Sequence, residues 1–193
     1  KAGGKEEDVL AFDTGPANVL IDEAVRITTD GRQSFDEGGK TALKGKINEQ
    51  WLNEIISEDK YLLKPPPKST GREYYTKEFA MNLYEQGIKK GLDNFDILAT
   101  ITAYTAKSIK NQIDAFVLDK YKIDELYVSG GGAHNQMIMK LLSEYIEADV
   151  RDVENLEFSG DAKEAIAFAI LGNEFLCGKT NNIPNSTGSN RKV

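Results

Sequence analysis

The stretch Glu125-Leu126-Tyr127-Val128-Ser129-Gly130-Gly131-Gly132-Ala133-His134-Asn135 joins a short, mainly apolar run to three consecutive glycines. The first five residues predict a strand, and the apolar residues after the turn recur at helical spacing up to Tyr145. A second short strand is expected over 148–153. This order of strand, turn and helix is typical of a βαβ module, so the sequence predicts an α/β fold.

Outside this unit, the chain is expected to be rich in helix. The spacing of apolar residues predicts helices over about 17–28, 76–87, 94–118 and 161–177, and another after Gly38-Gly39.

Asp8–Asp13 has the composition of a short strand, broken by Thr14-Gly15-Pro16. A strand with no neighbour until residue 125 is a poor nucleus for a sheet, so we expect the domain to be truncated at its N-terminus. Three prolines at 65–67 stiffen the chain and predict a joint near 64–75.

Composition limits the partners of the protein. The 193 residues, 40% hydrophobic and 28% charged, are enough for one sizeable core. A net charge of -7 argues against nucleic acid and against an anionic membrane surface, and favours small molecules. The longest apolar run, Ala165–Leu171, is far shorter than the roughly 20 residues of a membrane helix. A lone Cys177 and a lone His134 allow no internal disulfide and no zinc-type cluster, so we expect a cytoplasmic protein without its own metal site.

The three glycines are candidates for binding a nucleotide. They leave no side chain between the backbone and a bound group, and the helix that follows presents free N–H groups and a positive dipole end. Gly130, Gly131 and Gly132 therefore suit phosphates. The same glycines also fit a flexible turn with no ligand, and the residues alone do not decide between the two.

Other candidate residues also have simpler structural interpretations. Asp13 stands at the end of the predicted strand, where α/β sheets collect ligands and a carboxylate can act as a base, but an Asp there also initiates turns. Lys68 and Arg72 offer donors to a phosphate or a sugar, but loops after prolines are usually solvated surface. Glu164 fits a capping-box-like pair with Asp161 equally well.

Five ordered motifs resemble the anhydro-N-acetylmuramic acid kinase family, whose members are ATPases of the actin and hexokinase superfamily with a ribonuclease H-like fold. The motifs extend over nearly the whole chain and are Phe12-Asp13-Thr14-Gly15-Pro16-Ala17-Asn18, Pro67-Lys68-Ser69-Thr70-Gly71-Arg72-Glu73, Gly130-Gly131-Gly132-Ala133-His134-Asn135, Glu164-Ala165-Ile166-Ala167-Phe168-Ala169 and Asn182-Ile183-Pro184-Asn185-Ser186-Thr187-Gly188.

The resemblance implies an enzyme that opens the 1,6-anhydro ring of anhydro-N-acetylmuramic acid with water and phosphorylates O6 from ATP and Mg²⁺. The product would be N-acetylmuramic acid 6-phosphate, in cell-wall recycling. By this resemblance Asp13 is the general base that deprotonates the water. Its further implied site residues are, for ATP, Gly130, Gly131, Gly132 and Asn135 and, for the substrate, Gly15, Asn18, Lys68, Arg72 and Glu164.

One departure from the family bears on activity. The family's first phosphate-binding loop and two of its strands precede the Asp13 motif, and they are absent from this sequence. We therefore interpret residues 1–193 as the C-terminal nucleotide-binding domain of a two-domain sugar kinase, inactive alone and able to form a homodimer. Two alternatives are a noncatalytic actin-like module that binds ATP only to change shape, and a sugar-binding protein in which the glycine-rich turn has no purpose.

Overall fold

Helix α4, Asn94–Phe116, forms the centre of the fold. It begins at Asp93, whose side chain accepts a hydrogen bond from the backbone N–H of Asp96 and so caps the first turn. Residues on most of its faces are buried from Ile97 to Ser108. The computed structural model describes residues 8–156 and 162–190.

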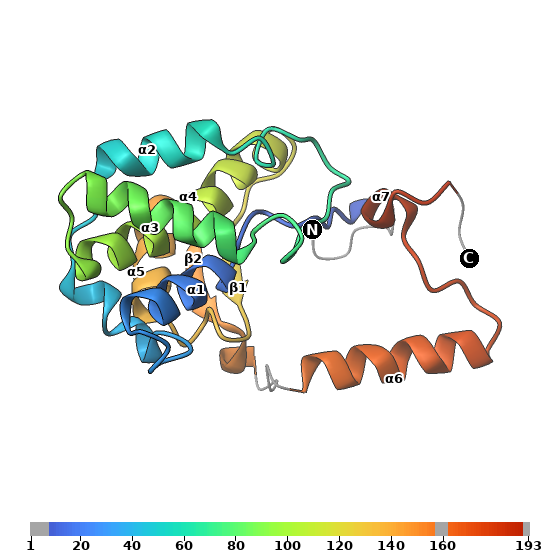
Figure 1. The fold of residues 1–193 in the computed structure, drawn as a ribbon. Coiled ribbons are helices and arrows are strands. Elements are labelled where there is room, and N and C mark those ends of the chain that lie inside the picture. Colours follow the sequence, from blue (N-terminus) through green and yellow to red (C-terminus); the bar gives the residue numbers. More distant parts are fainter. Residues whose placement is uncertain (1–7, 157–161, 191–193) are drawn as a thin grey trace.

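Four further helices pack around α4 and enclose the core (Figure 1). They are α1, Val19–Thr28; α2, Glu49–Glu58; α3, Lys77–Lys89; and α5, Gln136–Tyr145. Each turns an apolar stripe inward, as expected for amphipathic helices. At most 1% of each of these core side chains is exposed: Leu20, Trp51, Leu52, Tyr61, Tyr75, Ile97, Leu98, Ile101, Tyr104 and Leu142.

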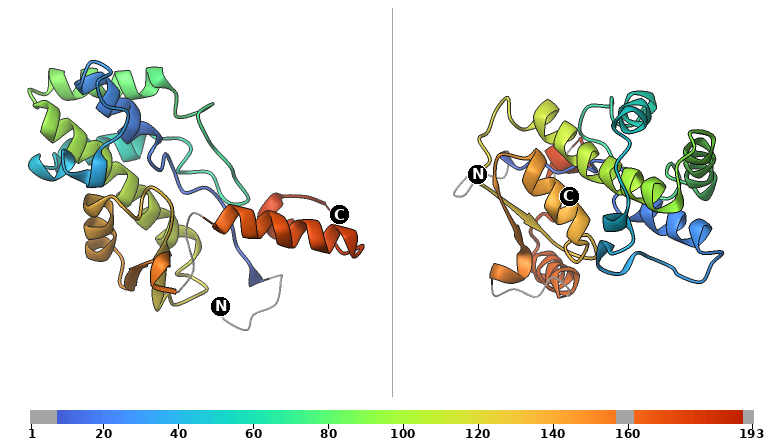
Figure 2. Two further views of the ribbon diagram at one scale, coloured as in Figure 1. Left: turned by 90° about the horizontal axis from the view of Figure 1, so that it is seen from below. Right: turned by 90° about the vertical axis from the view of Figure 1, so that its left-hand side faces the viewer.

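A small parallel sheet completes the body of the molecule. Strand β1, Glu125–Val128, pairs with β2, Asp149–Asp152, and Glu125 lies opposite Asp149. Helix α5 connects the two strands and packs against α4 (Figure 2). The predicted βαβ unit and helix-rich α/β fold are thereby confirmed.

The prediction of a strand at 8–13 is wrong, because this segment is not in a sheet. The chain is irregular there, and the backbone N–H of Asp13 donates to the carbonyl of Lys68, 3.2 Å away. A strand forms only where a neighbouring strand satisfies its backbone groups along its length. Within the described residues, the 8–13 segment has no such neighbour.

The helix expected after Gly38-Gly39 begins later than the sequence predicts. Two 3₁₀ turns come first, η2 at Glu37–Gly39 and η3 at Ala42–Lys44. Helix α2 then begins after Asn48, whose side chain accepts a hydrogen bond from the backbone N–H of Trp51 at 2.9 Å. The predictions for 17–28, 76–87 and 94–118 agree with α1, α3 and α4 to within two residues.

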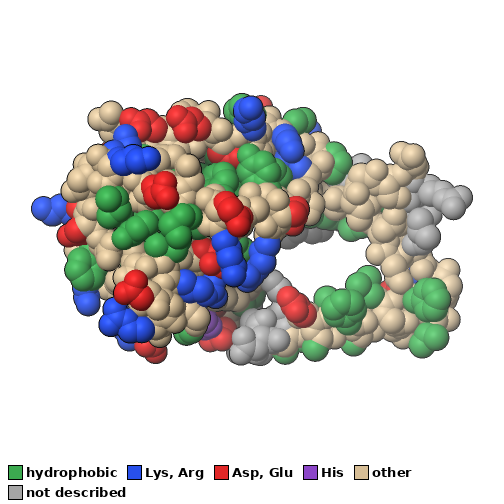
Figure 3. Space-filling view, in the orientation of Figure 1, with side chains coloured by type: hydrophobic (Ala, Val, Ile, Leu, Met, Phe, Trp, Pro, Cys, Tyr) green, Lys and Arg blue, Asp and Glu red, His purple; other side chains and the backbone are tan. Residues whose placement is uncertain are grey.

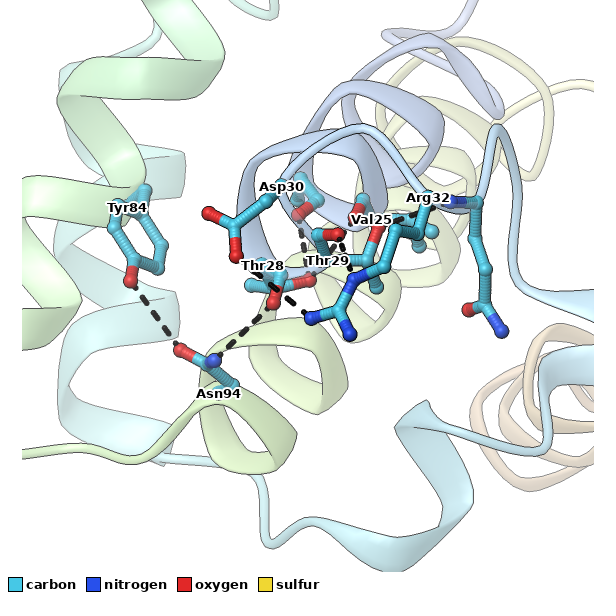
Figure 4. A network of polar contacts seen from close by, with 9 residues as sticks. Val25, Thr28, Thr29, Asp30, Arg32, Tyr84 and Asn94 are labelled. Carbon is cyan, nitrogen blue, oxygen red and sulfur yellow. Dashed lines mark hydrogen bonds and ion pairs between the residues drawn. The ribbon is translucent and has the colours of Figure 1, made fainter.

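Polar side chains connect the C-terminal end of α1 to its neighbours (Figure 4). Asn94 Nδ2 donates to the carbonyl of Thr28, 3.5 Å away, and Asn94 Oδ1 accepts from the hydroxyl of Tyr84 on α3 at 3.4 Å. Arg32 Nε donates to the carbonyl of Thr29 at 2.9 Å. These contacts satisfy carbonyls that a helix end leaves without a partner.

The last part of the chain extends from the body. After η4, Val153–Leu156, helix α6, Lys163–Leu176, lies to one side, and the short helix α7, Pro184–Thr187, returns toward the Pro66-Pro67 loop (Figure 1). The predicted cap Asp161 lies outside the described residues, so the capping pair with Glu164 is untested. Among the described helices, none combines the length and the apolar character needed to cross a membrane.

Candidate active site

The Asp13 carboxylate is held by the loop that follows the prolines. Its Oδ2 atom accepts hydrogen bonds from Ser69 Oγ and from the backbone N–H of Thr70, each at 2.8 Å. The hydroxyl of Tyr61 donates to the Asp13 carbonyl at 2.8 Å. The first two predicted motifs therefore meet at Asp13, although Asp13 and Thr70 lie 57 residues apart in the sequence.

Lys68 is held among aromatic rings rather than in an ion pair. Its Nζ atom lies 4.7 Å from the ring centroid of Tyr61, 5.4 Å from that of Phe116 and 5.8 Å from that of Phe12. It also donates to Gln112 Oε1. Burial lowers the pKa of the Lys68 ammonium, while the negative charge of Asp59 opposes the shift. In this arrangement the ammonium anchors the loop, and contact of Lys68 with the substrate remains a prediction.

Below this loop lies a buried carboxylate that the sequence did not reveal. Asp59 is 3% exposed, and its two oxygens accept hydrogen bonds from the hydroxyls of Tyr74, Tyr75 and Tyr104 and from the backbone N–H of Tyr61. A buried carboxylate is tolerated only when donors surround it. Asp59 therefore holds together the group of tyrosines that packs beside the loop that carries Lys68 and Ser69.

Helix α4 also holds the 13–18 segment in place, through buried polar residues that we did not predict. Thr105 Oγ1 donates to the carbonyl of Ala17 at 2.8 Å, and Ser108 packs against Gly15. A Cβ on Gly15 would come within 2.6 Å of Ser108 Oγ, so glycine is required there by close packing. Thr105, Ser108 and Gln112 stand three and four residues apart, so they lie on one face of α4, and each is at most 2% exposed. Their spacing was the available signal.

The glycine-rich turn lies against Asn18. A Cβ added to Gly131 would stand 3.0 Å from Asn18 Nδ2, and one on Gly132 would stand 3.9 Å from Asn18 Oδ1. Gly130 has a φ of +74°, a conformation that side chains disfavour. The first and third predicted motifs therefore meet at Asn18, as the second meets the first at Asp13.

Asn135 has a structural role in this turn. It is 6% exposed, and its Oδ1 atom accepts from the backbone N–H groups of Met137 and Ile138 at 3.0 and 3.1 Å, which caps α5. Gly39 packs so tightly against it that a Cβ there would come within 2.2 Å of Asn135 Oδ1. Direct contact between Asn135 and a nucleotide remains a prediction.

A cavity of about 290 Å³ opens beside Asn18 and the glycine-rich turn. Its volume is close to the lower limit of typical ligand sites. Burial raises the pKa of Asp22 in this cavity, and the positive charges of Arg26 and Arg72 oppose the rise. The charge of Arg72 therefore acts on Asp22. The residues lining what we call the Asn18 cavity include Asn18, Asp22, Arg26, Phe35, Gly131 and Asn135.

Glu164 is the predicted site residue that stands apart. It lies in the first turn of α6 and is exposed, and no hydrogen bond or ion pair joins its side chain to another residue in the described part of the chain. In those same ranges no group of three or more His, Cys, Asp or Glu side chains is placed to hold a metal ion. The structure therefore brings the first three motifs together and leaves the α6 motif apart from them.

Comparison with known proteins assigns the family. The family model described as anhydro-N-acetylmuramic acid kinase matches residues 4–193. The chain belongs to the anhydro-N-acetylmuramic acid kinase family. It is 41% identical to proteins of that name from Caldanaerobacter subterraneus subsp. tengcongensis, Clostridioides difficile and Francisella tularensis subsp. novicida, over 97–99% of this chain and 48% of each relative.

The chain thus spans about half the length of the curated anhydro-N-acetylmuramic acid kinases that it matches. The resemblance that the motifs indicated is confirmed at the level of the family.

Proposed function

We propose that this chain forms part of an ATP-dependent kinase that hydrolyses the 1,6-anhydro ring of anhydro-N-acetylmuramic acid and phosphorylates its O6, in the recycling of cell-wall peptidoglycan. Membership of the kinase family supports the reaction class. The observation that carries the proposal is the convergence at the Asp13–Asn18 segment, where Asp13 bonds to the 68–70 loop and Asn18 lies against Gly131. The base that activates water, Asp13, would then stand at one end of this six-residue segment. The turn that binds the nucleotide would lie against its other end, Asn18.

In this proposal Asp13 is the catalytic base. Its side chain is exposed, so that a water molecule can reach it, and one of its oxygens is already oriented by two donors. Asp13 would take a proton from the water that attacks the sugar, and the opened bridge would leave O6 to accept the phosphoryl group. A positioned base of this kind contributes about 10²–10⁴-fold to rate.

The glycine-rich turn and the Asn18 cavity fit a nucleotide. A Cβ on Gly131 would narrow the space beside Asn18, and the turn leads into the N-terminus of α5. The N–H groups of Met137 and Ile138 are already bonded to Asn135, so the free N–H groups expected there are partly occupied, and the support from α5 is its positive dipole end. ATP supplies the phosphoryl group when bound. Mg²⁺ is usually held by one or two carboxylates together with nucleotide phosphates, so it needs few ligands from this chain.

The part of the enzyme that this chain does not span would supply the opposite side of the active-site cleft. We propose that the chain is the C-terminal, nucleotide-binding domain of a cytoplasmic two-domain kinase of the actin and hexokinase type, with a joint near 64–75. Apolar side chains along α6 support a missing partner: Phe168 is 74% exposed, Phe175 73% and Leu176 86% (Figure 3). A helix that is apolar on all sides is normally buried. We propose that the other half covers α6 and brings Glu164 to the sugar.

The direct test uses the full-length kinase that contains this chain. With ATP, Mg²⁺ and anhydro-N-acetylmuramic acid, we expect one ADP for each N-acetylmuramic acid 6-phosphate, detected by mass spectrometry. Unopened but phosphorylated sugar would contradict the coupled hydrolysis. ATP binding without any turnover that depends on the sugar would favour the noncatalytic nucleotide-binding module instead.

A further inference from the structure

The two oxygens of the Asp13 carboxylate are in different environments. Oδ2 accepts from Ser69 Oγ and from the backbone N–H of Thr70, both at 2.8 Å. No donor from the described residues reaches Oδ1. The donors to Oδ2 resist rotation of the carboxylate, so the two oxygens do not exchange places freely.

The loop that supplies these donors is itself fixed to the Asp13 backbone. The Asp13 N–H donates to the carbonyl of Lys68 at 3.2 Å, and the Asp13 carbonyl accepts from Tyr61 at 2.8 Å. Lys68 Nζ is held over the Tyr61 ring and bonded to Gln112. The loop and Asp13 are therefore connected through the Asp13 N–H, its carbonyl and its carboxylate, which defines where Oδ1 points.

A base works only when its reacting oxygen is correctly placed, and an error of about 1 Å can reduce the rate about 100-fold. We propose that Ser69 and Thr70 are positioning residues that fix Oδ2 of Asp13, so that Oδ1 is the atom that accepts the proton from water. This inference rests on the proposed function. It adds that the short loop after the prolines controls the orientation of the base, while Thr70 acts through its backbone N–H.

Ser69→Ala in the full-length kinase removes one donor without removing the base. Because a hydrogen bond to a charged group is lost, we expect kcat to fall about 10- to 100-fold. The KM values for the sugar and for ATP should stay within about twofold, because neither is expected to bind through Ser69 Oγ. Ser69→Thr, which keeps a hydroxyl, should restore most of kcat. Ser57→Ala is the matched control, because this exposed serine loses only a bond to the Glu54 carbonyl.

A double-mutant cycle separates positioning from a general effect on folding. If Ser69 acts through Asp13, adding Ser69→Ala to Asp13→Asn should cause little further loss of kcat. Additive losses, or a Ser69→Ala variant with nearly normal kcat beside an inactive Asp13→Asn variant, would overturn the positioning role and leave the proposed function standing. Failure of the unmodified kinase to phosphorylate the sugar would instead contradict the proposed function.

Discussion

Gly131 lies against Asn18 so closely that a methyl group on its α carbon would stand 3.0 Å from the Asn18 amide nitrogen. Contacts this short require one neighbour to move, and the neighbour here is the end of a flexible side chain. Gly131→Val in the full-length kinase should therefore leave the fold intact but crowd the nucleotide cradle. Overpacking typically costs 1–3 kcal/mol, so we expect ATP to bind about 10-fold more weakly, measured by calorimetry.

Gly132→Ala is the matched comparison for this variant. Its added Cβ would lie at an ordinary 3.9 Å from Asn18 Oδ1, so the loss of ATP affinity should be clearly smaller. Binding of the sugar should change less than binding of ATP in both variants. Equal weakening of both ligands in Gly131→Val would indicate misfolding, whereas unchanged ATP affinity in a folded Gly131→Val variant would contradict a nucleotide site at the turn.

Asp13→Asn tests the base directly. The amide keeps the shape of the side chain but cannot accept a proton, so sugar phosphorylation should fall by about 10²–10⁴-fold. ATP affinity should be nearly unchanged, because Asp13 lies with the 68–70 loop and not at the glycine-rich turn. The measurements are product formation and ATP titration in the full-length kinase. Normal turnover would contradict the assignment.

Local patterns in the sequence predicted much of this arrangement. The apolar spacing of α4 and the strand, turn and helix order of β1 and α5 are local signals, and the structure confirms both. The strand at 8–13 could not be judged locally, because a strand depends on a partner elsewhere in the chain. The same limit applies to the contact of Ser69 with Asp13, which joins residues 56 apart. Asp59 gave no local signal because the three tyrosine hydroxyls that bond to it lie 15, 16 and 45 residues away in the sequence.

Asp59→Asn should destabilise the protein. An amide would present its own N–H groups to the donors now bonded to this buried carboxylate, which include the hydroxyls of Tyr74 and Tyr75 at 2.8 and 2.9 Å. Hydrogen bonds to charged groups contribute about 1.5–3 kcal/mol each, so we expect a loss of about 2–4 kcal/mol, measured by urea denaturation. Asp30→Asn, at an exposed residue, removes the same charge and should cost less than about 0.5 kcal/mol. Equal losses would show that Asp59 has no special role.

The tyrosines around Asp59 predict a loss of stability at alkaline pH. Burial, followed by the negative charges of Asp13 and Asp59, raises the pKa of Tyr61 to about 12, and burial also raises the pKa of Tyr74, Tyr75 and Tyr104. Tyrosine in an unfolded chain has a pKa of about 10. The folded state therefore binds these protons more tightly, and their contribution to stability is complete below pH 10 and falls as the pH rises toward 12.

This expectation can be measured by following tyrosinate absorbance and the unfolding midpoint together. The folded protein should ionise these tyrosines at higher pH than the urea-unfolded protein does, and the midpoint should fall most steeply above pH 10. Identical tyrosine titrations in the folded and unfolded states would contradict the buried environment of the cluster.

The exposed apolar surface of α6 predicts how the isolated chain associates. Phe168 and Phe175 are 74% and 73% exposed, and large exposed apolar side chains of this kind favour protein contacts. We expect the 193-residue chain to self-associate in sedimentation experiments. Replacing both phenylalanines with Gln should reduce the association, while Ile88→Gln, at a 48% exposed position on α3, should not. An unchanged association state in the double variant would exclude α6 as the contact surface.

Activity should require the half that this chain does not span. Phosphoryl transfer depends on holding the nucleotide, the metal and the acceptor in register, and the chain matches only 48% of the length of its relatives. It carries Asp13 and the glycine-rich turn, but Glu164 stands apart from both. Given ATP, Mg²⁺ and anhydro-N-acetylmuramic acid, the isolated chain should form no 6-phosphate and bind nucleotide weakly, whereas co-expression with the N-terminal half should restore turnover. The Phe168 and Phe175 double variant should impair this restoration, because the same helix would then dock less well onto its partner. Clear turnover by the isolated chain as a monomer would contradict the requirement for a second half.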